Sequence, residues 1–368
     1  MHADVLVIGA GIVGAACAHA LAQAGLRVHV LDARLGGATG AGMGHLVVMD
    51  DNPAELELSR RSLELWRGLA PRMPADCAWS PCGTLWIAGD AAEMAAAEDK
   101  QARLALHGVA CRMLDAQALA GAEPALRAGL AGALEVTGDA IVYAPNAARW
   151  LLAQGGGRIE VEHAQVEAIE DGRVRLVGGG LRQAPQVLLA NGMQATQLCP
   201  GLPIRPKKGH LAITDRYPGT VHHQLVELGY VTSAHHSEKP SVAFNLQPRP
   251  TGQLLLGSSR QFDTVDPRVE PDMLARMLGR AMDYVPGLAG LNILRTWTGL
   301  RAATPDSLPL LGPHPSRESL WLAVGHEGLG VTTATGSADL LAALMTGRTA
   351  AFDPAPYAAG RFVQATAA

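Results

Sequence analysis

Three glycines near the amino terminus and an aspartate that follows them have the types and spacing needed to bind a dinucleotide. Gly9, Gly11 and Gly14 form a Gly-x-Gly-x-x-Gly pattern, and Asp32 lies eighteen residues after the last glycine. The first glycine permits a tight turn, the second lets the backbone approach a pyrophosphate, and the third lets a helix pack close to a strand. A carboxylate at the end of the next strand accepts hydrogen bonds from a ribose and disfavours a 2′-phosphate, so NADP is not expected.

The residues around this pattern predict a βαβ unit that positions it. Val5–Ile8 is a short β-branched run, which is typical of a buried strand. Ile12–Ala24 is rich in helix formers and ends at Gly25, and Arg27–Leu31 has the pattern of a second strand. The free N–H groups at the helix N-terminus would face the phosphates. The apolar stretch is long enough to resemble a membrane span of about 20 residues, but the glycines interrupt it and we expect no transmembrane segment.

Length and composition restrict the class of protein. The chain has 368 residues, of which 48% are hydrophobic and 17% charged, so it can bury a large core and we expect two domains. The formal net charge of -4 gives no electrostatic support for nucleic-acid binding. No basic n-region or cleavage site precedes the first strand, so we expect a cytoplasmic protein, either free or held at the inner membrane by partner subunits.

The cysteines and histidines do not have the spacing of a metal site. The five cysteines are scattered without a Cys-x-x-Cys pair, which predicts reduced thiols. The pairs His222–His223 and His235–His236 are adjacent in sequence, and neighbouring strand residues point to opposite faces, so each pair offers at most one ligand. We therefore expect no bound metal. Lys207 and Lys208 are expected to be exposed to solvent.

The rest of the chain predicts short strands, helices and glycine-rich turns. Residues 34–52 form a long glycine-rich segment directly after the second strand. From Pro206 to Phe262 the pattern is antiparallel, with a Pro-Thr-Gly turn. A strand is expected within Gly83–Gly89 and another over Val187–Ala190, and helices are expected over about Pro53–Leu69, Ala91–Gly108, Pro145–Ala153, Pro271–Tyr284 and Thr332–Leu344.

Four separated motifs together resemble the D-amino acid oxidase superfamily of flavoproteins, in its glycine/sarcosine oxidase branch. They are the N-terminal fingerprint, "TGAGMGHL", "LLANG", and the C-terminal pair "GLRAATPDSLPLLG" and "GHEGLGVTTATG". Within that branch, "MGHLVVMDD" and "GHEGLGVTTATG" are most similar to bacterial D-hydroxyproline dehydrogenases and the related opine and cyanide-forming amine dehydrogenase subunits.

The resemblance implies an α/β (α+β) fold with two domains. Residues 1–82, 138–205 and 295–368 would form a Rossmann-like FAD-binding domain, and residues 83–137 and 206–294 a mainly antiparallel-sheet substrate domain. Some sarcosine oxidases carry a flavin-linking cysteine in the motif that corresponds to "LRAATPD". This chain has Ala302 and Ala303 there, so the FAD is expected to be non-covalent.

The expected FAD contacts come from distant segments that enclose a permanently bound flavin. The glycine-rich backbone of Thr39–Gly44 would offer amides to the pyrophosphate and the isoalloxazine edge. The turn Gly325–Gly330 precedes a helix whose N–H groups would face the flavin pyrimidine ring, where reduction places negative charge. The implied cofactor-binding residues are Gly9, Gly11, Ile12, Val13, Gly14, Asp32, Ala33, Arg34, Thr39, Gly40, Gly42, Met43, Gly44, His45, Val166, Asn191, Gly192, Arg301, His326, Gly328, Leu329, Gly330, Val331 and Thr332.

Four residues are candidates for substrate binding and catalysis. The resemblance implies that Arg301 pairs with a substrate carboxylate, for which a planar guanidinium is suited. His45 follows the flavin loop, where a structural role is an equal alternative to a catalytic one. Glu327 and Gly328 replace an aromatic residue and an arginine of the glycine oxidase pattern, and Glu327 would orient an ammonium or a hydroxyl group. Tyr230 would cap the substrate.

The expected activity is FAD-dependent oxidation of a small amino or imino acid of the D-proline or cis-4-hydroxy-D-proline type. Hydride transfer from the α-carbon to the flavin would give an imine, and a neutral amine needs no strong general base. Glycine/sarcosine or opine oxidation is the first alternative. A 2-hydroxy acid dehydrogenase and a flavin-carrying electron-relay subunit are the others. The resemblance to multi-subunit dehydrogenases also implies partner chains with further redox centres.

Overall fold

The computed structural model describes residues 2–229 and 239–362 and contains the predicted βαβ unit. Strand β1 (Val5–Ile8) is followed by helix α1 (Ile12–Gln23) and strand β2 (Val28–Asp32), and the two strands pair in parallel. Both strands are built largely from buried β-branched and leucine side chains, because helices or a further sheet cover both faces of this layer. Tyr230 and the pair His235–His236 lie outside the described residues.

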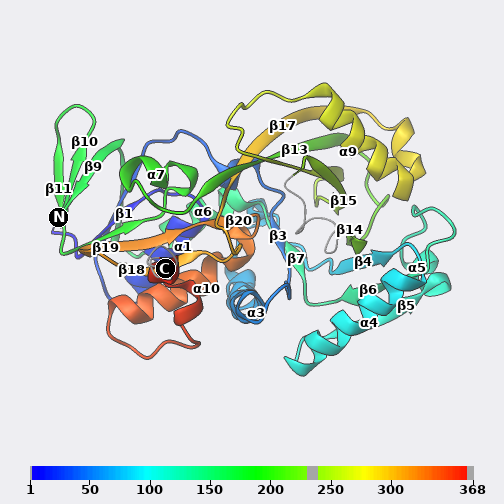
Figure 1. Ribbon diagram of the computed structural model, residues 1–368, viewed down its shortest axis with the longest axis horizontal. Coiled ribbons are helices and arrows are strands. Elements are labelled where there is room, and N and C mark those ends of the chain that lie inside the picture. Colours follow the sequence, from blue (N-terminus) through cyan, green and yellow to red (C-terminus); the bar gives the residue numbers. More distant parts are fainter. Residues whose placement is uncertain (1, 230–238, 363–368) are drawn as a thin grey trace.

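Six strands of the described chain form the sheet that contains this unit (Figure 1). The order is β18-β19-β12-β1-β2-β8, with antiparallel pairing between β18 and β19. Helix α1 packs on it together with α10, and α10 packs in turn on α3, while the small sheet β9–β11 covers the other face. The further bounds are β8 (Ile159–His163), β9 (Val166–Glu170), β10 (Arg173–Leu176), β11 (Leu181–Gln183), β12 (Gln186–Leu189), β18 (Leu310–His314), β19 (Arg317–Val324), α3 (Pro53–Leu69) and α10 (Gly330–Met345).

Nine strands of the described residues form a second, mainly antiparallel sheet, in the order β20-β17-β13-β16-β15-β14-β4-β6-β5. Helix α9 (Pro271–Tyr284) covers one face with Met277, Ala281 and Tyr284. The bounds are β4 (Thr84–Ala88), β5 (Cys111–Asp115), β6 (Gly132–Val136), β13 (Arg205–Arg216), β14 (Gln224–Glu227), β15 (Ser241–Pro248), β16 (Gln253–Phe262), β17 (Ile293–Ala303) and β20 (His326–Glu327). The expected domain boundary at residue 295 thus falls inside β17, which pairs with β13 along its length.

The glycine-rich segment after β2 lies between the two sheets and holds only short elements. Helix α2 (Ala38–Ala41) packs against β17, where the Trp297 indole donates to the Ala41 carbonyl at 3.0 Å. Strand β3 (His45–Leu46) then pairs with β7 (Ala140–Ile141), which precedes α6 (Ala144–Ala153). Helices α4 (Ala91–Leu106) and α5 (Ala116–Ala122) lie against β5 and β6, and α7 (Ala195–Leu198) follows β12.

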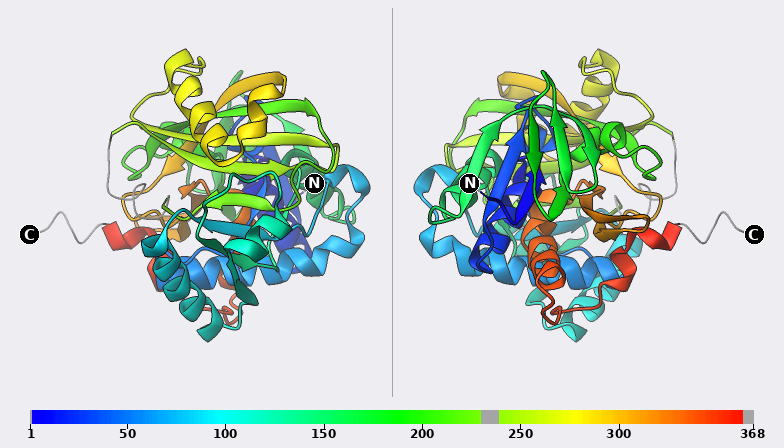
Figure 2. Two further views of the ribbon diagram at one scale, coloured as in Figure 1. Left: turned by 90° about the vertical axis from the view of Figure 1, so that its right-hand side faces the viewer. Right: turned by 90° about the vertical axis from the view of Figure 1, so that its left-hand side faces the viewer.

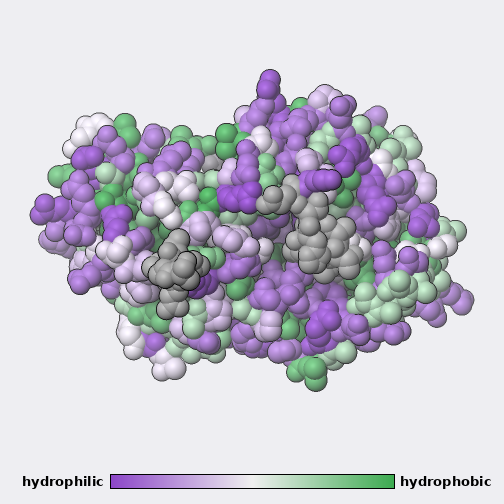
Figure 3. All heavy atoms as spheres, in the orientation of Figure 1, coloured by the Kyte–Doolittle hydropathy of each residue, from purple (hydrophilic) through white to green (hydrophobic). Residues whose placement is uncertain are grey.

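The two sheets lie side by side in the molecule, with α9 and the N-terminal βαβ unit far apart (Figures 1 and 2). On the face drawn in Figure 3, hydrophilic side chains alternate with small hydrophobic groups. Among the helices of the described residues, none combines the length and the apolar character that crossing a bilayer requires.

Candidate functional site

The N-terminus of α1 is shaped by close backbone approaches that only glycine permits. Gly9 has φ +106°, and a Cβ there would lie 2.7 Å from the Ala190 carbonyl oxygen. A Cβ on Gly14 would lie 2.0 Å from the Gly9 oxygen, so this glycine does let the helix pack against the strand turn. In the described chain, α1 has no side-chain cap at Gly11 and no acidic residue in its first turn. Its positive end can therefore face an anionic ligand, with the Ile12 N–H already bound by the Thr39 hydroxyl.

The Asp32 carboxylate fixes this glycine loop from the end of β2. Oδ2 accepts from the Ala10 N–H at 2.7 Å and Oδ1 accepts from the Arg34 N–H at 2.8 Å. A cavity of about 450 Å³ lies beside it and is lined by Ala33, Glu162, His163, Ala164, Gln165, Leu176, Val177, Gly178 and Gly180. Val166, at the start of β9, packs against the neighbouring cluster that includes Leu31. Asp32, Ala33, Arg34 and Val166 are thus brought together.

The segment Thr39–His45 meets the N-terminus of α1. The Thr39 hydroxyl accepts from the Ile12 N–H at 2.9 Å, which joins two motifs that are 27 residues apart. Gly44 has φ +81°, and a Cβ there would lie 1.9 Å from the Val142 carbonyl oxygen, so no other residue fits. Gly40 has open space around its Cα. The loop therefore lies where backbone amides can face a ligand bound at α1.

Asn191 and Gly192 follow β12 and lie against the same turn. The Asn191 Cα would be 2.9 Å from a Cβ on Gly9. Its side-chain Oδ1 is buried and has no hydrogen-bond partner within residues 2–229 and 239–362. A buried polar atom without a partner is costly, and a bound ligand with a donor group would satisfy it.

A second open helix end comes from α10. The helix begins at Gly330 after Leu329, and the structure shows neither a side-chain cap nor an acidic first turn in this described helix. The Thr332 hydroxyl donates to the His45 carbonyl at 3.0 Å and so ties this end to the glycine-rich loop. The His326 ring is buried beside the Ser337 hydroxyl at 3.1 Å, and burial lowers its pKa to about 3, so the imidazole is neutral.

The Arg301 side chain on β17 lies against two glycines, Gly209 of the neighbouring strand β13 and Gly328 of the turn before α10. Its Nη1 donates to the Ser259 carbonyl at 3.1 Å. The guanidinium lies over Gly209, where a Cβ would stand 2.6 Å from Nη2. Gly328 lies beside the base of the same side chain, where a Cβ would be 3.5 Å from Cδ and Nε. Only Gly209 is therefore required to leave room for the guanidinium, because a Cβ on Gly328 would be in ordinary van der Waals contact.

The expectation that Lys207 and Lys208 are solvent-exposed is wrong. Lys207 is 5% and Lys208 0% exposed. Both lie on β13, which pairs with β16 along one edge and with β17 along the other, and both faces of the strand are buried at these residues. Each buried ammonium has a carboxylate partner: Lys207 Nζ lies 2.5 Å from Glu327 Oε1, and Lys208 Nζ donates to Glu270 Oε1 at 2.7 Å. Lys207 is opposite Arg301 in the register of the sheet.

Glu327 is the anion of this cluster. Its backbone has φ +48°, and Oε2 accepts from the Gly328 N–H. Burial alone would raise the pKa of Glu327, but the charges of Lys207, Arg301 and Arg260 outweigh it and lower the pKa to about 2. Arg260 is 7% exposed and lies on β16. The cluster therefore presents an ionised carboxylate beside the Arg301 guanidinium.

The His45 side chain is bound within a buried polar network. Its Nδ1 lies 2.5 Å from Gln224 Oε1, which is an acceptor, so Nδ1 carries the proton and Nε2 faces Met43 Sδ at 3.3 Å. Burial lowers the pKa of His45 to about 4. The Gln224 hydrogen bond opposes this shift, and the charge of the nearby Arg249 adds to it. Arg249 Nη1 donates to Gln247 Oε1 at 2.7 Å and to the Met43 carbonyl at 3.2 Å. Sequence patterns did not identify Gln224, Gln247 or Arg249.

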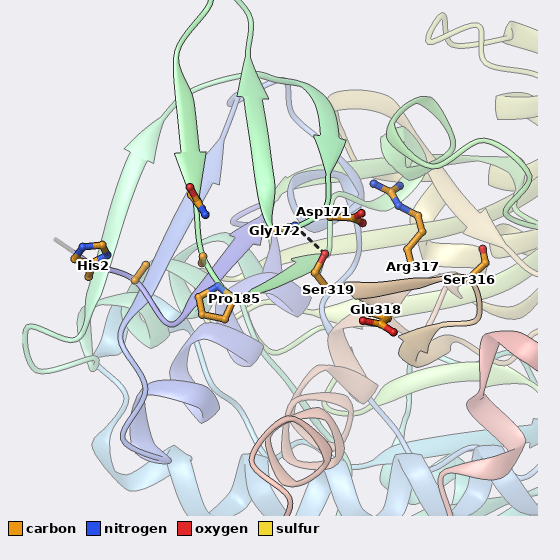
Figure 4. A pocket seen from close by; sticks show the side chains of 11 residues that line it. His2, Asp171, Gly172, Pro185, Ser316, Arg317, Glu318 and Ser319 are labelled. Atoms are coloured by element: carbon orange, nitrogen blue, oxygen red, sulfur yellow. Dashed lines mark hydrogen bonds between the residues drawn. The ribbon is translucent and has the colours of Figure 1, made fainter.

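His222 and His223 do not point to opposite faces as expected, because both precede β14 and both rings lie against Glu123. His222 Nδ1 is 3.5 Å from Glu123 Oε2, and His223 Nδ1 is 2.8 Å from Glu123 Oε1. Their backbone N–H groups donate to Glu123 Oε1 at 2.8 and 2.7 Å. A separate cavity of about 730 Å³, lined by residues such as His2, Asp171, Arg317 and Ser319, lies at the amino-terminal ends of β1, β12 and β19 in the six-stranded sheet (Figure 4). None of the sequence-predicted site residues lines it.

Comparison with known proteins agrees with this arrangement. A family model described as "FAD dependent oxidoreductase" (DAO) matches residues 4–344. The chain is 29% identical to glycine oxidase of Pseudomonas aeruginosa over 98% of this chain and 100% of that protein. It is 27% identical to hydrogen cyanide synthase subunit HcnC of the same species, covering 98% and 96% of the two chains.

The solved structure of glycine oxidase from Geobacillus kaustophilus superimposes with a TM-score of 0.87 at 25% identity, covering 98% of this chain and 99% of that chain. These similarities confirm the family, the FAD cofactor and the class of amino acid oxidoreductase that the motifs predict. The chain belongs to the DAO family of FAD-dependent oxidoreductases.

Proposed function

We propose that this enzyme oxidises a small cyclic imino acid, of the D-proline or cis-4-hydroxy-D-proline type, at the carbon that bears its carboxylate. The observation that supports the proposal is the juxtaposition of Arg301 and Glu327. A guanidinium and an ionised carboxylate lie in one cluster, with Gly328 packed against the arginine. A cation for the carboxylate and an anion for the nitrogen match the two polar groups of an amino acid.

The residues present fit a bound FAD. The open N-terminus of α1 and the Thr39–Gly44 backbone would hold its pyrophosphate, and Asp32 with the adjoining cavity would hold the adenosine end. The uncapped N-terminus of α10 would face the flavin ring, and Asn191 Oδ1 is a buried acceptor without a hydrogen-bond partner among the described residues. When bound, the flavin supplies the two-electron acceptor for the substrate.

Arg301 binds the substrate carboxylate through its planar fork and so fixes the α-carbon. Glu327 accepts a hydrogen bond from the substrate nitrogen. As the α C–H bond breaks and the hydrogen leaves with its electron pair, the nitrogen lone pair forms the C=N bond and positive charge develops on nitrogen. The Glu327 carboxylate is fixed beforehand where that charge appears and therefore stabilises the transition state. A substrate that enters as the neutral amine requires no further base.

An anaerobic substrate panel tests the proposal by the loss of flavin absorbance. The panel contains D-proline, cis-4-hydroxy-D-proline, sarcosine, glycine and 2-hydroxyglutarate. We expect the two cyclic imino acids to bleach the flavin fastest, and Glu327→Gln to slow the best of them about 100- to 1,000-fold, the range for loss of one preorganised electrostatic group. Faster reduction by glycine or 2-hydroxyglutarate would replace the proposed substrate class.

We also propose that the electrons leave through a partner chain. The similarity to HcnC, which is a subunit by its name, supports this proposal. Reoxidation of the reduced enzyme should then be slow in air-saturated buffer and fast with an artificial acceptor dye. Rapid reoxidation by oxygen alone would identify an oxidase instead.

A further inference from the structure

The ion pair between Lys207 and Glu327 joins the nine-stranded sheet to the turn before α10. Lys207 comes from near the start of β13, and Glu327 ends β20, three residues before the helix begins. The two charged atoms are 2.5 Å apart, and the side chains are 7% and 16% exposed. Such a shielded pair interacts much more strongly than one on the surface.

Burial and two neighbouring cations oppose the charge of Lys207. Arg301 lies opposite it on β17, and Arg260 is close enough to lower the pKa of Lys207. The Phe262 ring, with its centroid 4.9 Å from Nζ, favours the ammonium through a cation–π contact. Burial is the largest effect lowering this pKa, and Glu327 counteracts it. If the Lys207 ammonium only filled space, an apolar side chain of similar volume could replace it without loss of folding stability. Its partner is a residue that we place on the substrate nitrogen.

We propose that Lys207 is a positioning residue that holds the Glu327 carboxylate charged and in place beside Arg301 during the reaction. This inference rests on the proposed function, because it presumes that Glu327 acts on the substrate nitrogen. One face of the Glu327 carboxylate is held by the ammonium and the other by the Gly328 N–H. The carboxylate is therefore fixed before the substrate arrives, and no reorganisation is needed as charge develops.

The charges that face Glu327 determine what happens when Lys207 is removed. Arg301 on β17 and Arg260 on β16 still favour the ionised form, whereas burial opposes it. Glu55 on α3 also faces this region, but burial, Asp51 and Glu327 raise the pKa of Glu55 to about 8, so Glu55 is largely neutral at pH 7. Loss of the nearest cation therefore raises the pKa of Glu327 and allows it to become protonated on the acid side of the profile.

The test compares Lys207→Met with Lys208→Met in the FAD-loaded enzyme. Lys208 is a matched control because it is the next residue of the same strand, is also buried, and pairs with Glu270 instead. The limiting rate of flavin reduction is measured by stopped flow from pH 5 to 10 with the fastest amino acid of the panel. FAD content and melting temperature are recorded for each variant.

We expect Lys207→Met to lose at least ten-fold in rate at pH 5 relative to the wild type, through an additional acid limb that the wild type lacks because its Glu327 has a pKa of about 2. The rate should recover as pH rises, Lys207→Arg should restore the wild-type profile, and Lys208→Met should leave its shape unchanged. If Lys207→Met does not retain FAD, Lys207→Gln carries the same comparison, because it removes the charge and keeps a donor.

Two results separate the inference from the proposed function. A Lys207→Met profile that superimposes on the wild type, or falls equally at every pH, while Glu327→Gln slows reduction, overturns the role of Lys207 alone. An unaffected Glu327→Gln variant overturns the proposed role of Glu327 and with it this inference.

Discussion

The Arg301 guanidinium lies directly over Gly209 of the neighbouring strand, where a Cβ would come within 2.6 Å of Nη2. The absence of a side chain at Gly209 lets a long cationic side chain lie flat on the sheet between β13 and β17. Its backbone hydrogen bond to Ser259 keeps it there. The position of the guanidinium is therefore set by the backbones of three strands, which suits a group that must hold a substrate at a fixed distance from a cofactor.

Replacement of Arg301 should reduce turnover without loss of FAD. Arg301→Ala leaves a bound carboxylate unpaired in a shielded site, which costs roughly 2 to 5 kcal/mol, so kcat/KM should fall about 30-fold or more. Arg301→Lys should recover only part of the loss, because an ammonium keeps the charge and not the fork. Steady-state kinetics with the best panel substrate measure both variants.

The exposed Arg295 on the same strand is a control, because its guanidinium lies over the Trp297 ring, 5.3 Å from the centroid, six residues before Arg301. Arg295→Ala should keep wild-type kinetics. Near wild-type efficiency in fully FAD-loaded Arg301→Ala would mean that another cation holds the carboxylate, and Arg260 would be the next residue to test. Lys208 is no longer a candidate, since it pairs with Glu270.

Local patterns predicted the elements whose signals are short in range. The strand–glycine turn–helix unit and helix α9 (Pro271–Tyr284) follow their expected bounds, because periodicity and glycine breaks lie within a few residues of one another. The helix before the C-terminus begins two residues earlier than expected, at Gly330, since a glycine-rich turn gives no sharp start signal.

The contacts within the site could not be predicted in this way. His45 and Gln224 are 179 residues apart in sequence. They meet because the folded chain brings β3 next to β14 of the nine-stranded sheet. For Lys207, a usable signal was present. Alternation along β13 places Lys207 with Gly209 and Leu211 on one face and Lys208 on the other, so two adjacent lysines in a covered strand cannot both face solvent. The carboxylates that pair with them come from distant segments.

Asp32→Ala should lower FAD occupancy and leave the apo fold intact. The carboxylate accepts the Ala10 and Arg34 N–H groups, so its loss releases the glycine loop as well as the ribose contact. The ratio of flavin to protein absorbance and far-UV circular dichroism measure the two effects. Asp4→Ala, which removes an exposed pair with Arg27 at the other end of this sheet layer, is the control. Unchanged FAD affinity in Asp32→Ala contradicts the assignment.

The FAD should be released when the protein is precipitated with acid. Ala302 and Ala303 carry no nucleophile. In the glycine-rich loop, His45 Nε2 lies 3.3 Å from Met43 Sδ, so these two side chains contact each other. The supernatant should contain all of the flavin, with the absorbance and mass of free FAD. Flavin that remains with the washed precipitate would show a covalent bond.

The buried Glu55 should make the folded protein less stable as pH rises. Its pKa is raised from 4.5 to about 8, chiefly by burial, so the folded state holds a proton that the unfolded state has lost between these values. Stability from this group is thus present below pH 4.5 and lost as pH rises through 8. At about 1.4 kcal/mol per pKa unit, Glu55→Gln should stabilise the protein by up to about 5 kcal/mol at pH 9. The amide keeps the acceptor for the Asp51 N–H. Melting curves of FAD-loaded protein at pH 5 and pH 9 measure the difference, which should fall to about 1 kcal/mol or less at pH 5. Glu57→Gln on the same helix, whose partner Arg60 is at the surface, should show no such pH dependence. An equal effect of Glu55→Gln at both pH values would show that Glu55 is not protonated in the folded state.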